Sequence, residues 1–405
     1  MDFWNSKPED AGSDPDWISN LIKEQVDMYD TDSKQETIVN SILEGHRLGV
    51  EDAKYLYDTM SLSNLATLAN TVKKARHGDK VYFNRNLHVN QTNVCVLACR
   101  FCAFRRGPRA DDAYSLGIDD YLSRIRPFER VITEVHTVGG LHPDWRIDHY
   151  ENLFRTTKEE FPEISIKALT AVEIKHLAEI SGLTIKETLT RLKSAGLDSL
   201  PGGGAEILVD RVRDIICRGK ESSQEYLDIH RYAHEIGLPT NSTMLFGSVE
   251  TIDERLIHLD SLRLLQDETA GFQCFVPYPF LPDSTRLPEA QLASSSEILR
   301  VIAISRLMLD NFPHIKAYRM NLGDKVAQMA LTCGADDIDG TVGHEEIMHL
   351  AGSSTPLDDD MGGMVRMISQ LGMSPVERNT TYTRFQRRDR KNPPPSSGSR
   401  LPMAA

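Results

Sequence analysis

The chain has 405 residues, which is enough for one large domain or two ordinary ones. Its hydrophobic content of 40% with 26% charged residues is ordinary for a globular protein, and no apolar run approaches the roughly 20 residues that span a bilayer, so we expect no membrane insertion. A formal net charge of -13 argues against general nucleic-acid binding, because neutralising phosphates requires clustered Lys and Arg.

The N-terminal region predicts two kinds of segment. Residues 1–36 begin acidic and are broken by Pro and Gly, the opposite of a basic and then apolar secretory signal. We therefore expect a disordered arm on a cytoplasmic protein. Residues 37–80 carry apolar side chains at three- and four-residue spacing, which predicts a helical extension.

Residues 81–355 alternate short β-branched segments with longer helical patterns, so the fold class is α/β. This much alternation favours a (β/α)8 barrel of the TIM type over a doubly wound sheet. The strand candidates are 86–92, 131–140, 164–170, 197–204, 239–247, 272–278, 315–322 and 336–342. The helix candidates are 119–130, 149–161, 171–182, 184–196, 223–237, 251–268 and 294–312. Loops that mix Gly or Pro with polar residues follow several strands, and we expect the chemistry at that end of the barrel.

The C-terminal region predicts a strap and a tail. Residues 356–378 include a helical pattern that suits a last strap over the barrel. Residues 379–405 are basic and rich in Pro and Ser, which predicts a solvated, disordered tail.

Three of the six cysteines lie within eight positions, at Cys95, Cys99 and Cys102. A disulfide would leave one thiol over and does not suit the compartment. A zinc site requires a fourth ligand, for which His88 or His136 could be recruited. Three inert core thiols are a further alternative. The fourth interpretation is a four-iron, four-sulfur (4Fe-4S) cluster with one iron open to a small molecule. The other three, Cys217, Cys274 and Cys333, are isolated and predict small core residues.

The CxxxCxxC spacing resembles the signature of the radical S-adenosylmethionine (SAM) enzymes. That resemblance implies one 4Fe-4S cluster on the three cysteines, with SAM on the open iron. It also implies that Phe101 packs near the adenine, that Gly139 and Gly140 receive the SAM amino group, and that Glu206 faces SAM. Each of these residues has an alternative explanation. Phe101 could serve ordinary loop packing, the two glycines could serve a tight turn, and Glu206 could complement a helix dipole.

Several segments extend this resemblance over residues 84–355. They are NVCVLACRFCAF, EVHTVGGLHPDW, KALTAVEI, AGLDSLPGGGAEIL, TNSTMLFGSVET, LQDETAGFQCFVP and GADDIDGTVGHEEI. The set is similar to the futalosine-pathway enzymes of menaquinone biosynthesis and to the deazaflavin-cofactor synthases. VHTVGGLHP, KALTAVEI and GADDIDGT resemble most the aminofutalosine synthase family; the dehypoxanthine futalosine cyclases are a sister family.

This family resemblance implies that SAM is a cosubstrate. Its deoxyadenosyl radical would add to 3-((1-carboxyvinyl)oxy)benzoate, with rearrangement, loss of the carboxylate carbon and release of methionine. A one-electron donor such as flavodoxin or ferredoxin would reduce the cluster. A cluster- or zinc-binding protein without catalytic activity is the alternative from another class.

Strand alternation puts Glu134 and His136 on one face, where they could point into the barrel. His136, or His142 in the following loop, could move a proton, although a lone strand histidine is more often structural. Cationic candidates for the two substrate carboxylates are Lys167, His314 and Arg319. The acids Asp336, Asp337 and Asp339 could line the end of the last strand or solvate a turn.

Overall fold

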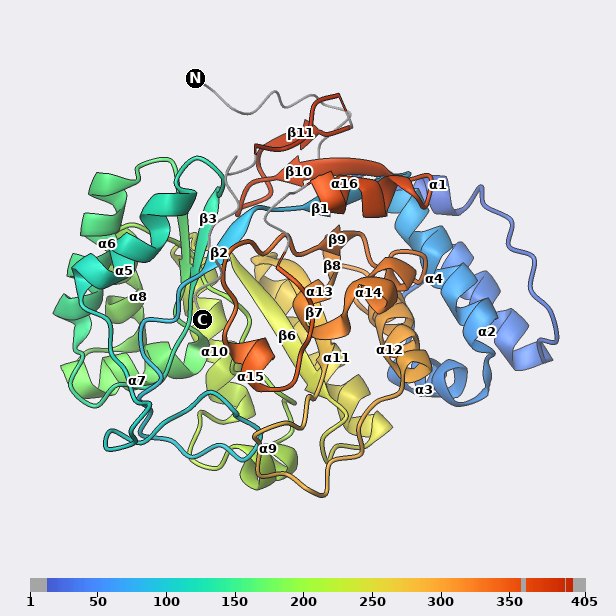
Figure 1. The fold of residues 1–405 in the computed structure, drawn as a ribbon. Coiled ribbons are helices and arrows are strands. Elements are labelled where there is room, and N and C mark those ends of the chain that lie inside the picture. The colour runs from blue at the N-terminus through green and yellow to red at the C-terminus, as the bar shows by residue number, and fades with distance from the viewer. Residues whose placement is uncertain (1–12, 358–361, 390, 396–405) are drawn as a thin grey trace.

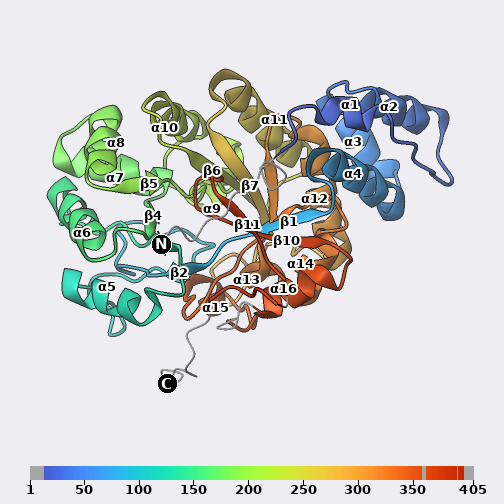
Figure 2. The ribbon, with the colours of Figure 1, turned by 90° about the horizontal axis from the view of Figure 1, so that it is seen from above.

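The computed structural model describes residues 13–357, 362–389 and 391–395. Four helices open the described chain and lie beside the outer helices at one side of the molecule (Figures 1 and 2). They are α1 (Trp17–Leu21), α2 (Ser33–Leu43), α3 (Val50–Thr59) and α4 (Leu62–His77). Part of the arm that was predicted to be disordered is therefore helical, because Leu21 is buried against the extension. The first twelve residues of that predicted arm lie outside the described part of the chain.

Eight strands coincide with the eight strand candidates. They are β2 (Asn86–His88), β3 (Glu134–Thr137), β4 (Ser165–Ala168), β5 (Leu197–Ser199), β6 (Thr240–Phe246), β7 (Phe272–Pro279), β8 (His314–Ala317) and β9 (Asp337–Ile338). Neighbours pair in parallel as β2-β3-β4-β5 and as β6-β7-β8-β9. Parallel bridges from Leu200 to Thr240 and from Asn86 to Thr341 join the two groups at both seams. The (β/α)8 barrel prediction is confirmed.

Helices cover the outside of the barrel (Figure 2). They are α5 (Ile118–Ile125) with the short helix η2 (Arg126–Phe128), α6 (Ile147–Glu160), α7 (Ala171–Ser181), α8 (Ile185–Ser194), α9 (Asp210–Ile216), α10 (Ser223–Glu235), α11 (Ile252–Thr269), α12 (Ser295–Met308), α13 (Arg319–Leu322) and α14 (Asp324–Ala330). None of the helices in the described ranges is both long and apolar enough to cross a bilayer.

The helix starts explain how the loops at the strand ends are fixed. Helices α7, α8, α10 and α11 each begin with a capping box, in which a Ser or Thr and a Glu three residues later satisfy the first backbone N–H groups. Every residue of β6 is buried, as expected for a barrel strand covered on both faces. Of these helices, α7 follows β4 and α11 follows β6, so capping boxes fix the turns at the carboxyl ends of those two strands.

Three further strands lie at the end of the barrel opposite α9 and the short helix α15 (Ile347–Leu350), as Figure 1 shows. They are β1 (Lys80–Phe83), β10 (Ser374–Arg378), which follows helix α16 (Gly362–Ser369), and β11 (Phe385–Arg387). Strand β1 pairs with both β9 and β10, and β11 pairs antiparallel with β10.

The predicted disorder of the basic tail is wrong for residues 379–389, which include β11. Arg388 of this segment binds Glu377 at 2.6 Å, and both side chains are buried; Glu377 also binds Arg85 at 2.7 Å. Composition does not show that a basic side chain has a buried partner, which is why it suggested a solvated segment. Residues 390 and 396–405 of that tail lie outside the described residues.

Candidate active site

The three clustered cysteines lie on the loop that leaves β2 and line one cavity of about 210 Å³. Cys99 is buried, Cys95 and Cys102 are half-buried, and all three thiols are free. The loop is anchored at both ends, because the Cys95 N–H donates to the Arg106 carbonyl at 3.0 Å and the Arg100 N–H donates to the Ile216 carbonyl at 2.8 Å.

The spacing of these sulfurs distinguishes two of the proposed sites. One zinc ion at about 2.3 Å from each sulfur would hold them roughly 4 Å apart. Among the described residues, the three thiols do not form a group whose ligand atoms all lie within 4.8 Å of one another. His88 and His136 are absent from the lining of this cavity and line a second one. Three separated thiols facing one cavity fit a cluster, whose irons each take one sulfur, better than a single ion.

Gly139 and Gly140 pack against the backbone that leads to the cysteines. A Cβ at Gly140 would lie 2.1 Å from the Val94 carbonyl oxygen, and one at Gly139 would lie 2.7 Å from the Thr92 carbonyl oxygen. The Gly140 N–H donates to that Thr92 oxygen at 2.8 Å. Glycine is therefore required here for contact between two loops, and only Gly139 of the pair lines the cavity.

The capping box of α7 forms another part of the cavity wall. The Glu173 carboxylate accepts hydrogen bonds from the backbone N–H of Thr170 at 2.7 Å and of Gly139 at 3.0 Å. Burial raises the pKa of Glu173 above its ordinary value. This one carboxyl group fixes the glycine turn after β3 to the start of α7.

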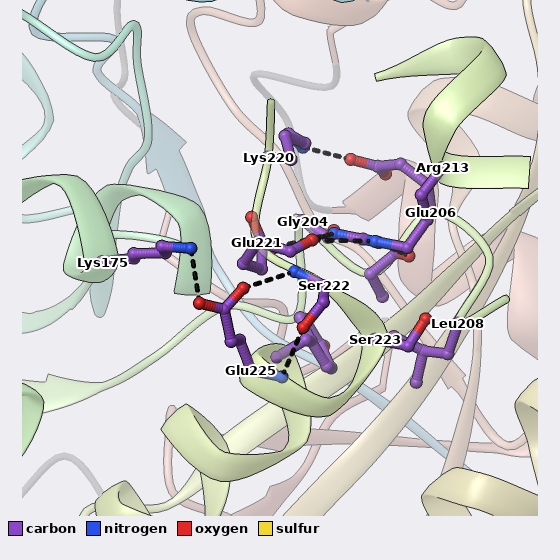
Figure 3. Close-up of polar contacts among 12 residues, drawn as sticks. Lys175, Gly204, Glu206, Leu208, Arg213, Lys220, Glu221, Ser222, Ser223 and Glu225 are labelled. Atoms are coloured by element: carbon purple, nitrogen blue, oxygen red, sulfur yellow. Dashed lines mark hydrogen bonds and ion pairs between the residues drawn. The ribbon is translucent and has the colours of Figure 1, made fainter. Parts of the chain in front are cut away.

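Glu206 and Lys220 meet at the same cavity, which Phe101 also lines (Figure 3). Glu206 has a φ of 42°, in the left-handed region that non-glycine residues rarely adopt, and its carbonyl accepts from the Leu245 N–H at 2.9 Å. It lies four residues before α9, so it does not complement that helix's dipole. The Lys220 ammonium lies 5.4 Å from the centre of the Phe101 ring.

The second cavity, of about 190 Å³, lies beside the first inside the barrel. Val138, Thr170, Tyr278, Ile347 and Met348 line both cavities and so form the wall between them. We call the first the cysteine cavity and the second the lysine chamber, because the buried Lys167 and Lys316 line the latter.

Glu134 and His136 both point into the lysine chamber, as strand alternation predicted. The Lys167 ammonium lies 3.5 Å from the Glu134 carboxylate. Burial alone would raise the pKa of Glu134, but the neighbouring cations, led by Lys167, hold it below its ordinary value. The His136 ring stacks on His88 with ring centres 4.5 Å apart. Burial, with the lysines, lowers the pKa of His136 to about 3, so the imidazole is neutral near pH 7.

Lys316 from β8 and two acids complete the charged lining of the chamber. Lys316 lies 3.1 Å from Asp337, which Arg378 also binds at 2.8 Å. Burial raises the pKa of Asp339. Burial raises the pKa of Glu345 to about 7, although its carboxylate accepts the Met348 N–H at 2.7 Å. The chamber is therefore lined by two lysines and three acids, and the pKa is lowered for Glu134 but raised for Asp339 and Glu345.

Other sequence candidates lie away from both cavities. His142 stacks on Trp145 with ring centres 4.4 Å apart and lines neither cavity. The predicted strand 315–322 ends at Ala317, so Arg319 lies in α13, where it pairs with Asp324 at 2.9 Å. His314 and Asp336 are paired at 2.5 Å in the base of the barrel.

Comparison with known proteins agrees with this architecture. The family model for the radical SAM superfamily matches residues 89–262, and the model for the CofH/MqnC C-terminal region matches residues 269–391. An aminodeoxyfutalosine synthase of Thermus thermophilus is 44% identical over 87% of this chain and 96% of its own length. One of Streptomyces coelicolor is 41% identical over 84% and 90%. The chain belongs to the aminodeoxyfutalosine synthase family of radical SAM enzymes.

Sister families and solved structures extend the comparison. A cyclic dehypoxanthine futalosine synthase of Streptomyces coelicolor is 37% identical over 86% of this chain and 88% of its own length. Methylornithine synthase has a TM-score of 0.67 at 19% identity, covering 85% of this chain and 97% of that chain. The FeFe-hydrogenase maturase of Carboxydothermus hydrogenoformans has a TM-score of 0.66 at 16% identity, covering 86% and 80%. These structures support the fold, and the family implies a 4Fe-4S cluster and SAM.

Sequence reasoning missed several lining residues, which are Lys220, Lys316, Tyr278, Tyr318 and Glu345. Lys316 could have been found, because it is the third residue of β8 and alternation places it on one face with His314. Glu345 lies in an irregular segment after β9, where no periodic pattern predicts orientation.

Proposed function

We propose that this enzyme is an aminodeoxyfutalosine synthase, which adds the 5'-deoxyadenosyl group of SAM to 3-((1-carboxyvinyl)oxy)benzoate, with rearrangement and decarboxylation, and releases methionine. The observation that carries the proposal is the 44% identity to a synthase of which the chain covers 96%. Two adjoining cavities, one lined by cysteines and one by lysines, support it further.

Cys95, Cys99 and Cys102 are the proposed ligands of the 4Fe-4S cluster. When bound, the cluster and SAM supply a deoxyadenosyl radical by one-electron cleavage of the sulfonium. Phe101, Gly139 and Glu206 line the same cavity and are the proposed contacts of SAM. Because the two cavities share a wall, we expect SAM to lie next to the second substrate.

The lysine chamber is the proposed site of the dicarboxylate substrate. Lys167 and Lys316 are buried, and an ammonium that is shielded from water attracts a carboxylate more strongly than an exposed one does. Both already have acidic partners, Glu134 and Asp337, which fix the positions of the ammonium groups. The raised pKa values of Asp339 and Glu345 mean that burial disfavours the negative forms of these two acids, which reduces their repulsion of a dicarboxylate.

His136 is proposed to hold a substrate carboxylate in the chamber. Because its pKa is lowered to about 3, the imidazole stays neutral and is a weak base, so it can donate its N–H to a carboxylate without adding charge. Glu134 is the proposed positioning residue, because it orients the Lys167 ammonium at 3.5 Å. A small redox protein such as flavodoxin or ferredoxin is the proposed electron donor.

An anaerobic incubation of reconstituted protein with SAM, reductant and the carboxyvinyloxybenzoate, analysed by mass spectrometry, tests the proposal. We expect an adenosyl-containing adduct from the wild type and from Cys333→Ala, a buried cysteine outside both cavities, and none from Cys99→Ala. Release of deoxyadenosine with the benzoate unchanged would contradict the synthase and favour a cyclase-type reaction.

A further inference from the structure

Lys220 is a buried lysine on the wall of the cysteine cavity that sequence reasoning did not identify. Its side chain is 9% exposed, its ammonium pairs with Glu206, and it lies over the ring of Phe101. A lone buried ammonium is unfavourable, so a partner and an aromatic face are both expected. The pair nevertheless faces a cavity, whereas a purely structural pair would be enclosed.

Arg213 fixes both members of the Glu206–Lys220 pair (Figure 3). Its guanidinium donates to the Gly204 carbonyl at 3.0 Å and to the Glu221 carbonyl at 3.0 Å. It also lies 3.2 Å from the Glu221 carboxylate. One buried side chain therefore ties the turn before Glu206 to the residue after Lys220, which sets the pair's position relative to the cysteines.

Charged side chains of both signs line this cavity. Among its lining residues in the described chain, the cations are Lys220 and Arg105, and the acids are Glu173 and Glu206, beside the three thiols. Glu173 already accepts several hydrogen bonds, and its raised pKa disfavours its charged form. Lys220 is thus a buried positive charge on the wall of the cavity that the three cysteines line.

We propose that Lys220 raises the reduction potential of the cluster held by the three cysteines, and that Glu206 limits this effect by partly neutralising the ammonium. Three thiolates give the cluster site negative charge, and the incoming electron adds another, so a buried cation favours the reduced form. A neighbouring carboxylate has the opposite effect. The inference rests on the cluster ligands proposed above and needs neither the organic substrate nor SAM.

The test is an anaerobic redox titration of the reconstituted protein without SAM, following the electron paramagnetic resonance signal of the reduced cluster. At a fixed potential, Lys220→Met is expected to lower the ratio of reduced to oxidised cluster about tenfold, the size expected for one charge acting over roughly 10 Å at the effective dielectric constant of a protein interior. Glu206→Gln is expected to raise the ratio. Lys220→Arg, which keeps the charge, should stay near the wild type.

Lys175→Met is the matched control, because Lys175 also pairs with a glutamate, Glu225, at 2.6 Å, but lines neither cavity. Iron content and circular dichroism check that each variant is folded and loaded. If the substitutions only loosened the site, Lys220→Met and Glu206→Gln would change the ratio of reduced to oxidised cluster in the same direction. That result, or equal reduction potentials in all variants, would overturn the inference. If Lys220→Met does not bind a cluster, Glu206→Gln alone decides: a ratio of reduced to oxidised cluster that is lower than or equal to that of the wild type overturns the inference. A wild type that binds no cluster would overturn the proposed ligands as well.

Discussion

Both ends of this barrel bury charged side chains, but they use them differently. At the base, His77, His314 and Asp336 lie with their ligand atoms within 4.8 Å of one another and are fully buried. Arg306 and His314 both pair with Asp336, and His77 bonds to the Pro313 carbonyl at 3.0 Å, so these groups are held by one another and by the backbone, although His77 Nδ1 and one Arg306 nitrogen lack a hydrogen-bond partner. None of them lines the two cavities.

At the mouth, buried charges line a cavity. Glu134, Lys167, Lys316 and Glu345 line the lysine chamber. The comparison teaches that a cluster of buried histidines and acids does not by itself mark a site. Position relative to the carboxyl ends of the strands does, as in other barrels of this type.

The largest expected effect is the loss of a cluster ligand. Cys99→Ala should lower the turnover of SAM by at least about 1000-fold, since the bound group supplies the chemistry. Iron content and product mass spectra measure this, with Cys333→Ala as the control. Turnover within tenfold of the wild type would contradict the assignment of Cys99.

At the base, Asp336→Asn is expected to lower the free energy of unfolding by about 3–5 kcal/mol, because it leaves the buried Arg306 guanidinium without its acidic partner. Urea denaturation measures the change. The activity of the folded fraction should stay near that of the wild type. If Asp336→Asn kept normal stability but bound the substrate poorly, the base would be part of the substrate site, which would contradict its structural role.

In the lysine chamber, Lys316→Met should lower kcat/KM about 100-fold, the loss expected when one partner of a buried charge pair with the substrate is removed. Calorimetry with the carboxyvinyloxybenzoate would show the same loss in affinity without any turnover. Lys186→Met is the control, because Lys186 pairs with Glu235 at 2.8 Å on the surface. This variant should bind the carboxyvinyloxybenzoate with the affinity of the wild type. Equal affinities for the two variants would remove Lys316 from the site.

The chamber should also respond to pH through Glu345. Because its pKa is raised to about 7, the carboxyl gains negative charge between pH 6 and pH 8, and we expect KM for the dianionic substrate to rise about tenfold. In stability, a raised acid pKa favours the folded state at low pH, and this contribution is lost as the pH rises toward 7. Glu345→Gln should flatten the KM profile. An unchanged profile in that variant would assign the titration to another group.

The smallest effect is expected at His142. Because its ring stacks on Trp145 outside both cavities, His142→Ala should change kcat/KM by less than about twofold, within the range of a surface substitution. His136→Gln, inside the chamber, should lower it about tenfold. Equal losses in the two variants would show that the loop after β3 contributes to the chemistry.

The sequence predicted the parts of the molecule that depend on local pattern. The eight barrel strands follow from short β-branched segments between helical ones, and the cysteine loop follows from its spacing. Glu134 and His136 were placed correctly because alternation decides which side chains face inward.

Contacts between distant segments could not be predicted in the same way. Strand β10 begins with Ser374 and Pro375, which resembles a loop, yet it pairs with β1 almost 300 residues earlier in the chain, as the partnership of Lys80 with Ser374 shows. His314 and Asp336 were expected near the mouth because they adjoin strands, but they lie at the starts of β8 and β9, toward the base. A strand predicted from sequence shows which face of the strand a side chain lies on. Its position along the barrel axis depends on where the strand begins and on its register with its neighbours, which the sequence pattern does not give.

The most direct test of the central claim is a crystal structure of the reconstituted enzyme with SAM and isophthalate, a stable dicarboxylate. We predict iron density bonded to Cys95, Cys99 and Cys102 and the dicarboxylate against Lys167 and Lys316 in the adjoining chamber. Iron held by the histidines of the base, or the dicarboxylate bound outside the lysine chamber, would contradict the account.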